Sequence, residues 1–270
     1  MAQRQFGLRS QRHARIVSSA AIAEEAQTAR PYSSFTQVYD FLIGDPAHFE
    51  LRKAFDQSVR RFDLSFRSIA DIGCGSGRFI AGLAHLPIDI IGVDRSSAML
   101  ALCGRRMAGR PTVLLRQDIR SLSLPAPVDL ITCHNQTINY VTVLDDLARA
   151  FQAIARSLRR GGAFLFDFIA RIGQMRPAAT ERIREIIRLP HHKVSFDGVV
   201  DPARGRSTIR IGVAGARNPG GRVLEVHRQR WFSAPMIARL LSASGFRVLD
   251  MRPIGPNRDS AWLYVVARKS

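Results

Sequence analysis

Short apolar runs alternate with segments of helical periodicity through the central part of the chain. Apolar residues at every third or fourth position predict helices, and short unbroken apolar runs between turn residues predict strands. Strands are expected at residues 68–73, 88–93, 112–117, 128–134 and 162–168. Helices are expected at residues 77–85, 96–108 and 144–158. Because strands separated by helices form parallel sheets that are covered on both faces, the pattern predicts a doubly wound α/β fold.

The hydrophobic period changes on either side of this alternation. Before it, residues 32–44 and 47–62 predict two helices. After it, a helix is expected near residues 174–187. The period then becomes two, and strands are expected at residues 191–200, 207–216 and 222–232, with a turn at 218–221. This change predicts a small antiparallel β insertion after the fifth strand. A helix at 234–244 and strands at 246–252 and 260–268 complete the expected elements.

Three segments follow from this pattern: a basic tail at residues 1–28, a helical lid at 29–66 and a core at 67–270. The core would carry an antiparallel cap at about residues 188–232. The first 23 residues hold four arginines and no acid, which is typical of disordered basic tails and also of organelle transit peptides. We favour the tail, and the transit peptide stays open.

Charge is strongly basic, with 40 Lys and Arg against 22 Asp and Glu among the 270 residues. Only Lys53, Lys193 and Lys269 are lysines, so part of the arginine bias reflects a GC-rich genome rather than a function. Residues 201–270 nevertheless hold 13 basic and 4 acidic residues, a net charge of 13 − 4 = +9. This end of the chain is expected to attract anions.

The cysteines, the metal-ligating residues and the apolar runs narrow the class of protein. Cys74, Cys103 and Cys133 lie far apart without CxxC spacing, so neither a disulfide framework nor a zinc site is indicated. We expect no metal at all. No run reaches the roughly 18 apolar residues of a membrane span, and the N-terminus has no apolar signal core. We therefore expect a cytoplasmic protein.

A glycine cluster marks the end of the first expected strand, in the stretch ADIGCGSGRF at residues 70–79. Gly73, Gly75 and Gly77 follow Asp71, where an open α/β sheet binds ligands at its carboxyl edge. Glycines let the backbone approach a ligand and adopt positive φ. The spacing is GxGxG rather than the dinucleotide GxGxxG, because Arg78 stands at the sixth position. A purely structural tight turn is the alternative.

Two further acids end the next two expected strands. Asp94 closes the second strand, where a carboxylate can bind both hydroxyls of a ribose. A helix N-cap is its alternative role, although Ser96 or Ser97 can cap that helix. Asp118 closes the third strand, where it can accept from an adenine amino group while Ile119 packs on the ring; a plain turn residue is the alternative. Together these sites describe an adenosine pocket.

With DIGCGSG, GVD, QDI and the stretch VDLITCHNQTINYV, residues 32–168 resemble the class I S-adenosylmethionine-dependent methyltransferases. The resemblance implies a mostly parallel seven-stranded Rossmann-like sheet. It also implies that the glycine loop holds the methionine part of the cofactor, Asp94 the ribose and Asp118 the adenine. The full cofactor-binding set that we expect is Tyr32, Asp71, Gly73, Cys74, Gly75, Gly77, Asp94, Arg95, Met99, Asp118, Ile119 and Asn135.

The branch of the family is indicated more loosely. The aromatics of PYSSFTQVYDFL, the strand insertion and the C-terminal stretch 228–251 are similar to small-molecule enzymes such as amino-sugar and glycine N-methyltransferases. His134 to Thr137 replace the Asp/Asn-Pro-Pro-aromatic motif with which DNA and glutamine methyltransferases hold a planar amine or amide. Nucleobase amines are therefore disfavoured as acceptors.

Acceptor-side candidates come from three places. His134 and Asn135 follow the fourth strand at the carboxyl edge, as candidate catalytic residues; a structural histidine is the alternative for His134. In strand 222–232, period two places Glu225, His227 and Trp231 on one face, so that His227 can act as general base. A solvent-facing polar strand is the alternative. The expected substrate-binding residues are Tyr39, Tyr140, Arg228, Arg230 and Trp231.

The sequence thus predicts methyl transfer from S-adenosylmethionine to N or O of a small, anionic metabolite. Such transfer needs mainly alignment of the acceptor and exclusion of water. Two other classes stay open: an RNA methyltransferase that uses the basic tail and lobe, and a non-catalytic S-adenosylmethionine-binding or scaffold protein. The first lacks an appended RNA-binding module, and the second would need no base on the acceptor side.

Overall fold

The computed structural model describes residues 27–42, 45–170, 180–215, 218–255 and 260–270. The chain forms two compact units, which are described separately. The first comprises residues up to Gly44 together with Gln174–Arg230, and the second comprises Asp45–Gly173 and Trp231–Ser270. The expected tail falls almost entirely outside the described residues, and the expected three-part division stays a prediction.

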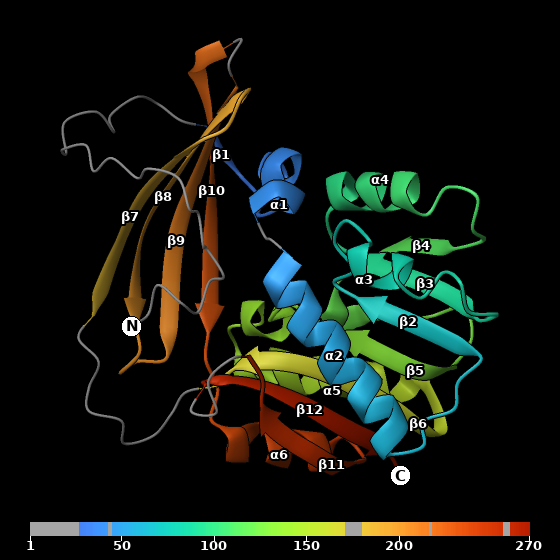
Figure 1. The fold of residues 1–270 in the computed structure, drawn as a ribbon. Helices are drawn as coiled ribbons and strands as arrows, with labels where there is room; N and C mark the ends of the chain where they lie inside the picture. Colours follow the sequence, from blue (N-terminus) through green and yellow to red (C-terminus); the bar gives the residue numbers. More distant parts are fainter. Residues whose placement is uncertain (1–26, 43–44, 171–179, 216–217, 256–259) are drawn as a thin grey trace. The chain divides into compact units, whose positions relative to one another are not determined.

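The second unit is built on a seven-stranded sheet, coloured from cyan to red in Figure 1. Its strands, in the spatial order of the sheet, are β11 (Phe246–Pro253), β12 (Trp262–Lys269), β6 (Leu158–Ile169), β5 (Val128–Cys133), β2 (Ser68–Ile72), β3 (Asp89–Asp94) and β4 (Val113–Arg116). All neighbouring pairs from β6 to β4 are parallel, and β12 and β11 add antiparallel strands. The predicted doubly wound, mostly parallel sheet is confirmed.

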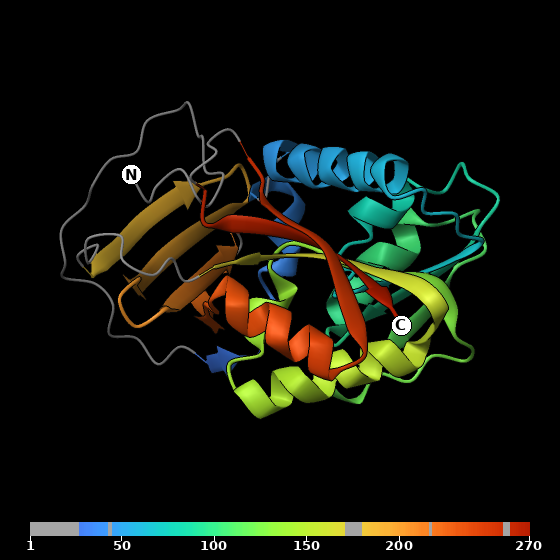
Figure 2. The same ribbon diagram turned by 90° about the horizontal axis from the view of Figure 1, so that it is seen from below.

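Helices cover both faces of this sheet, as Figure 2 shows. On one face lie α2 (Asp45–Arg61), α3 (Arg78–Ala81) and α4 (Ser97–Arg106), and on the other lie α5 (Leu144–Ser157) and α6 (Ala234–Ala243). Phe55 and Phe79 pack in the first core, and Phe151, Phe164 and Phe166 pack in the second. Each core buries apolar surface on one side of the sheet, and this burial is the main driving force for the fold.

The order of the strands places a ligand-binding edge at β2 and β5. From the central strand β2 the chain proceeds outward through β3 to β4, and then returns to the other side of β2 through β5 to β6. This reversal is the topological switch point, and open α/β sheets bind ligands there, at the carboxyl ends of the strands that correspond to β2 and β5. The short 3-10 helices η2 (Ile119–Ser121) and η3 (Thr137–Tyr140) follow β4 and β5 at the same edge.

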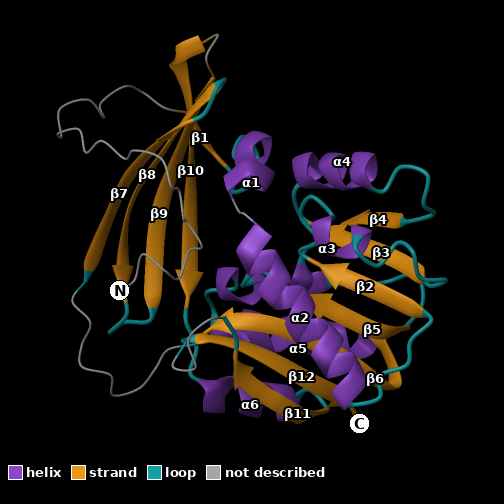
Figure 3. Ribbon diagram, viewed as in Figure 1, coloured by secondary structure: helices purple, strands orange, loops and turns teal. Residues whose placement is uncertain are grey.

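The first unit is a five-stranded sheet, which Figure 3 shows in orange with α1 in purple. Its strands, in spatial order, are β1 (Gln27–Ala29), β10 (Asn218–Arg230), β9 (Arg206–Gly215), β8 (His192–Asp201) and β7 (Glu181–Arg188). β8, β9 and β10 form the three antiparallel strands that were expected, β7 adds a fourth, and β1 pairs in parallel with β10. Helix α1 (Thr36–Leu42) shares the apolar core of this unit through Val38 and Leu42, and Phe35, directly before the helix, packs in the same core.

Two local predictions in this unit are wrong. Residues 181–188 form strand β7 instead of the end of a helix at 174–187. Ile183, Ile186 and Ile187 have helical spacing, but pairing with β8 decides the conformation; residues 174–179 lie outside the described part. The turn expected at 218–221 also belongs to a strand, because β10 begins at Asn218, which pairs with Gly215.

None of the helices in the described part of the chain is both long and apolar enough to span a bilayer.

Candidate functional site

The glycine loop after β2 has the conformation for which its sequence was singled out. Gly73, Gly75 and Gly77 have φ of 71°, 54° and 77°. A Cβ on Gly73 would lie 2.6 Å from Oγ1 and Cγ2 of Thr137, and one on Gly77 would lie 2.5 Å from Sγ of Cys103. Nothing lies within 4 Å of the corresponding point at Gly75. Close packing therefore requires the outer two glycines, and the middle one leaves the backbone open to a ligand.

Asp71 lies beneath this loop rather than on its surface. Its side chain is buried, and Oδ1 accepts a 2.7 Å hydrogen bond from the Thr132 hydroxyl. Burial raises the pKa of Asp71 to about 7, against the lowering effect of the Thr132 hydrogen bond. A carboxyl in this position stabilises the pairing of β2 with β5. Any effect of Asp71 on a cofactor is exerted through the glycine loop.

Asp94 connects the end of β3 to the loop. Its Oδ2 accepts from the Gly75 amide at 2.9 Å, and its Oδ1 accepts from the Ser96 amide at 2.8 Å. Ser96 itself caps α4 by accepting from the Met99 amide, so Asp94 is not needed as the N-cap. Burial raises the pKa of Asp94, although these two amides oppose the shift. A carboxylate has about four lone-pair sites, so Asp94 can still accept from a hydroxyl group.

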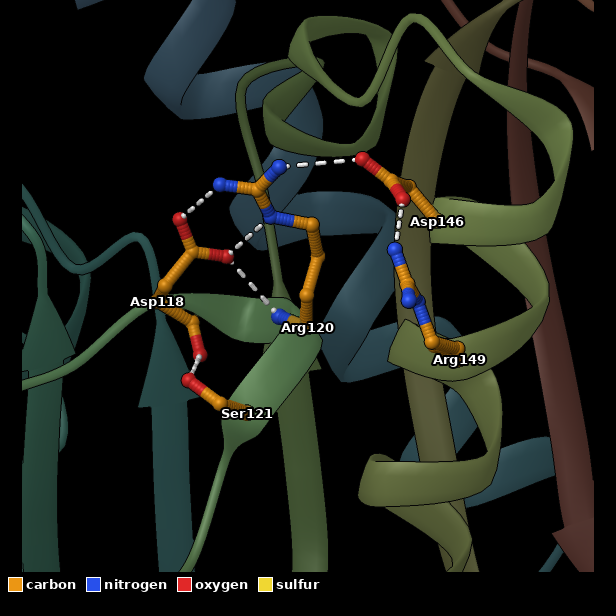
Figure 4. Close-up of polar contacts among 5 residues, drawn as sticks. All are labelled: Asp118, Arg120, Ser121, Asp146 and Arg149. Atoms are coloured by element: carbon orange, nitrogen blue, oxygen red, sulfur yellow. Dashed lines mark hydrogen bonds and ion pairs between the residues drawn. The ribbon is translucent and has the colours of Figure 1, made fainter.

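Asp118 forms an ion pair with Arg120, a residue that the sequence analysis did not single out. The Arg120 guanidinium donates from Nε to Oδ1 and from Nη2 to Oδ2, each at 2.8 Å, and the Arg120 amide also donates to Oδ1 (Figure 4). Arg120 extends to Asp146, which also binds Arg149. The Arg120 hydrogen bonds are the main reason that the pKa of Asp118 lies below its usual value. The adenine role of Asp118 therefore competes with an ion pair, and it stays a prediction.

His134 directly follows β5, which ends at Cys133. The ring is buried against Phe79 and Tyr264, and its Nε2 lies 3.1 Å from the Tyr264 hydroxyl. Burial lowers the pKa of His134 to about 3, so the ring is neutral at ordinary pH. These contacts fit the structural alternative for His134. Its expected catalytic role would need the ring to act as a very weak base.

A tight turn follows His134. Asn135 and Gln136 have φ of 56° and 60°, a left-handed conformation that side chains disfavour. The Asn135 side chain is exposed, as a residue that contacts a ligand requires. Asp167 on β6 accepts from the Gln136 amide at 2.9 Å and from the Trp262 indole at 2.6 Å. Asp167 was not singled out, although one acid in the apolar run FLFDFI was a usable signal.

The other expected cofactor residues of this unit, and the expected substrate-binding residue Tyr140, differ in exposure. Cys74 and Met99 are buried, Ile119 and Tyr140 are half-buried, and Arg95 is exposed. The Cys74 amide donates to the Val93 carbonyl, as does the Gly73 amide, and these bonds fix the start of the loop beside β3. Cys74 and Met99 can therefore shape the site by packing, whereas Arg95 and Tyr140 have side chains that a ligand can reach.

In the first unit, Glu225 organises the chain before α1. Its buried carboxylate accepts from the amides of four consecutive residues, at 2.6–3.0 Å, and from one hydroxyl: the amides of Tyr32, Ser33, Ser34 and Phe35 and the hydroxyl of Ser33. Burial would raise the pKa of Glu225, but the hydrogen bonds from His227 and from these amides outweigh it and hold the pKa below its usual value.

His227 shares this carboxylate. Its Nε2 lies 3.1 Å from Glu225 Oε2, and its ring meets Tyr32 edge-on with centroids 5.0 Å apart. Tyr32 also contacts the Tyr39 ring and has φ of 62°. The expected alternation of β10 is present, because Glu225 and His227 are buried and Arg228 is exposed. The solvent-facing alternative for His227 is thus wrong.

The remaining substrate-side candidates lie on different strand faces or in different units. Arg228 and Arg230 lie on the strand face opposite Glu225 and His227, with Arg228 exposed and Arg230 half-buried. Trp231 falls in the other unit, directly before α6. Within the described residues no group of three His, Cys, Asp or Glu side chains could hold a metal ion.

The second unit fits the cofactor that the resemblance implies. Open backbone at Gly75, the Asp94 carboxylate bonded to that same glycine, and an exposed turn at Asn135 lie at the switch-point edge. The glycine loop would hold the methionine part of S-adenosylmethionine, and Asp94 would hold the ribose. Bound there, the cofactor supplies an activated sulfonium methyl group.

Comparisons with known proteins agree with this site. A family described as "Methyltransferase domain" matches residues 69–162. A putative methyltransferase, YqeM from Bacillus subtilis (strain 168), is 26% identical over 138 residues, which cover 50% of this chain and 54% of that protein. The chain thus spans about half the length of that relative. A dTDP-4-amino-2,3,4,6-tetradeoxy-D-glucose N,N-dimethyltransferase from Saccharopolyspora spinosa is 32% identical over 101 residues, covering 37% of this chain and 40% of that enzyme.

A solved structure extends the likeness of the fold over most of the chain. It is a S-adenosylmethionine-dependent methyltransferase from Clostridium acetobutylicum ATCC 824, with a TM-score of 0.74 and 21% identity, and the match covers 88% of this chain and 99% of that one. The family match falls on the part of the chain that carries the glycine loop, Asp94 and Asp118. Residues 69–162 therefore match a methyltransferase domain, and this match agrees with the resemblance to the class I S-adenosylmethionine-dependent methyltransferases and with S-adenosylmethionine as the cofactor.

Proposed function

We propose that this protein transfers the methyl group of S-adenosylmethionine to an amino nitrogen of a small, anionic metabolite, such as a nucleotide-linked amino sugar. The observation that supports methyl transfer is the geometry of the glycine loop. Nothing lies within 4 Å of the Cβ position of Gly75, and the Gly75 amide donates to Asp94. The nitrogen acceptor is supported by the relative that dimethylates a dTDP-linked amino sugar.

The chemistry needs few protein groups. A sulfonium methyl is already activated, so alignment of the acceptor and exclusion of water supply most of the rate. An amine acceptor must reach the methyl with its lone pair free, which requires a base to take its proton. His227 is the base that we propose, because its contact with the Glu225 carboxylate orients the ring and stabilises an imidazolium.

Charge supports an anionic acceptor. The sheet of the first unit exposes Arg182 and Arg184 on β7, Arg206 and Arg210 on β9, and Arg228 on β10. Arginine binds phosphate through a planar fork of N–H donors, so this sheet can attract a nucleotide-linked substrate. Cys74, Cys103 and Cys133 are all buried free thiols, which is compatible with the reducing cytoplasm that we propose as the location.

A screen with radiolabelled S-adenosylmethionine tests the proposal. Purified protein is incubated with nucleotide-linked amino sugars, with metabolite extracts and with total RNA, beside the Asp94→Ala variant. We expect label in an amine-bearing small molecule, and less label with the variant at a limiting concentration of cofactor. Label in RNA would support the RNA methyltransferase instead, and cofactor binding without any acceptor would support the scaffold.

A further inference from the structure

A row of polar side chains crosses the apolar sheet of the second unit near its carboxyl edge. Asp167 pairs with Tyr264 on the neighbouring strand β12. On the other side, Cys133 pairs with Phe166, so that His134 comes next to Asp167. His134 in turn bonds to Tyr264. Buried polar groups are costly unless they are paired, so this row needs an explanation.

Asp167 is fully buried, and its two oxygens have different surroundings. Oδ2 accepts from the Gln136 amide at 2.9 Å and from the Trp262 indole N–H at 2.6 Å. Oδ1 and the Nδ1 of His134 have no hydrogen-bond partner among the described residues. The carboxylate thus accepts from a backbone turn, and the hydrogen bonds within helices and between strands form without it.

The turn that Asp167 holds is strained. Asn135 and Gln136 are both in the left-handed region, which non-glycine residues disfavour. Such a conformation persists when its surroundings over-determine it. A charge-assisted hydrogen bond to the Gln136 amide supplies that restraint.

The same turn sets the position of the glycine loop. Thr137 follows Gln136 and donates its hydroxyl to the His134 carbonyl at 2.7 Å. Its Oγ1 and Cγ2 lie 2.6 Å from the point that a Cβ on Gly73 would occupy, so Thr137 packs directly on the Gly73 backbone. A continuous set of contacts therefore runs from Asp167 through Gln136 and Thr137 to Gly73.

We propose that Asp167 is a positioning residue for the cofactor site: its carboxylate holds the Asn135–Gln136 turn, and through Thr137 the glycine loop, in the conformation that binds S-adenosylmethionine. This inference rests on the proposed function only in taking that loop as the methionine-binding element. Because the carboxylate is the better acceptor, ionisation of Asp167 and binding of the cofactor favour each other.

Titration of Asp167 falls in an accessible range. Burial raises the pKa of Asp167 to about 7, against the lowering effect of the Trp262 and Gln136 hydrogen bonds. The ionised form prevails above this value, so the affinity for cofactor is highest above pH 7 and falls as the pH falls through it. Among the described residues, the other titratable or charged groups around the row are Cys133 on β5, His134 directly after it, Tyr264 on β12, Asp71 on β2, Arg252 on β11, and His48 and Asp56 on α2.

Asp71 titrates in the same pH range as Asp167, because its pKa is also raised to about 7. Its ionisation would add to any change of cofactor affinity with pH. His134, with its pKa lowered to about 3, stays neutral in the same range, and the pKa values of Cys133 and Tyr264 are raised above it. The variants Asp167→Asn and Asp71→Asn therefore have to be compared. Asparagine keeps an acceptor oxygen and the side-chain shape, but it cannot ionise.

The experiment measures binding of S-adenosylhomocysteine by calorimetry from pH 5.5 to 8.5. We expect the wild-type affinity to fall toward the acid end of this range. At pH 8, Asp167→Asn should bind about tenfold more weakly, the factor that corresponds to weakening one charge-assisted hydrogen bond. Its affinity should change less with pH than that of Asp71→Asn. Asp129→Asn is the control, because Asp129 also accepts from backbone amides, those of Arg67 and Ser68, at the opposite end of the sheet.

A second readout uses the wild-type side chains and does not depend on the folding of any Asp167 variant. The indole N–H of Trp262 donates to Asp167, so its NMR signal should move with the ionisation of Asp167 and again when S-adenosylhomocysteine binds. Trp231→Phe assigns the signal, since the chain has two tryptophans.

The inference would be overturned if the wild-type affinity for S-adenosylhomocysteine does not change with pH and the NMR signal of the Trp262 indole N–H does not shift when this ligand binds. Equal affinity of Asp167→Asn and wild type at pH 8 would also overturn it. Failure of the wild type to bind at all would instead reject the proposed function.

Discussion

The Asp94 carboxylate accepts a hydrogen bond from the Gly75 amide at 2.9 Å, and this contact joins the end of β3 to the loop that follows β2. Asp94 would thus have two effects on a bound cofactor. It would offer acceptor oxygens to the ribose hydroxyls, and it holds the backbone of Gly75, the glycine of this loop that leaves space at its Cβ position.

Loss of Asp94 should weaken cofactor binding. Asp94→Ala removes a charge-assisted ribose contact and the anchor of Gly75, so we expect both S-adenosylmethionine and S-adenosylhomocysteine to bind about 1–3 kcal/mol more weakly. Calorimetry measures this change. Asp89→Ala is the control, because Asp89 stands exposed at the start of the same strand. Unchanged affinity in Asp94→Ala would reject the assigned pocket.

Arg120 should compete with adenine for Asp118. Asp118→Ala is expected to weaken binding of S-adenosylhomocysteine, whereas Arg120→Ala should leave binding intact or strengthen it, because the carboxylate is released from the ion pair. Arg149→Ala is the matched control, since Arg149 binds the same Asp146 without contacting Asp118 (Figure 4). If Arg120→Ala and Asp118→Ala weaken binding equally, the pair acts as one unit and the competition is disproved.

The sequence predicted the sheet and the loop well because local signals and tertiary structure agree there. Gly73, Gly75 and Gly77 need positive φ, and apolar runs such as β5 are buried on both faces. It failed at β7, where apolar spacing permits a helix and only the pairing with β8 decides. The Arg120–Asp118 pair and the hydrogen bonds of Asp167 were missed for a related reason. Their side chains meet through the fold, and no motif spacing shows which partner each one takes.

The glycines should differ in how they tolerate alanine. Gly75→Ala meets only the cost of its positive φ, about 1–2 kcal/mol, because nothing lies near its Cβ position. Gly73→Ala adds a clash with Thr137, so it should lower the free energy of unfolding further. Urea denaturation measures both variants. Thr137→Ala in the Gly73→Ala background should recover part of the loss, and a double variant no more stable than Gly73→Ala would contradict the clash.

Asp71 should make the stability of the protein depend on pH. Its pKa rises from 3.8 to about 7 on folding, so the folded state retains a proton that the unfolded chain has lost. This contribution is fully present below pH 3.8 and is lost as the pH rises through 7, by on the order of 4 kcal/mol at most. Asp71→Asn should therefore lose less stability than wild type between pH 5 and pH 8 in urea denaturation. Parallel curves for the two proteins would show that Asp71 does not titrate on folding.

The His227–Glu225 pair should separate catalysis from cofactor binding. If His227 accepts the proton of the amine, His227→Ala should lower turnover by about 10²–10⁴-fold and leave the affinity for S-adenosylhomocysteine nearly unchanged. Glu225→Gln should act differently. It replaces an acceptor oxygen by an amide group in a carboxylate that takes four backbone N–H bonds, so it should lower the melting temperature as well as turnover.

His134→Ala is the comparison for that pair, because this histidine is buried against Phe79 and Tyr264 and its pKa is lowered to about 3. We expect it to reduce the melting temperature more than the turnover per folded molecule. Turnover is measured with labelled cofactor and the acceptor found in the screen, and folding by thermal denaturation. If His227→Ala transfers methyl groups at the wild-type rate while His134→Ala does not, the base has been assigned to the wrong histidine. If neither variant is slowed, alignment of the acceptor alone accounts for catalysis.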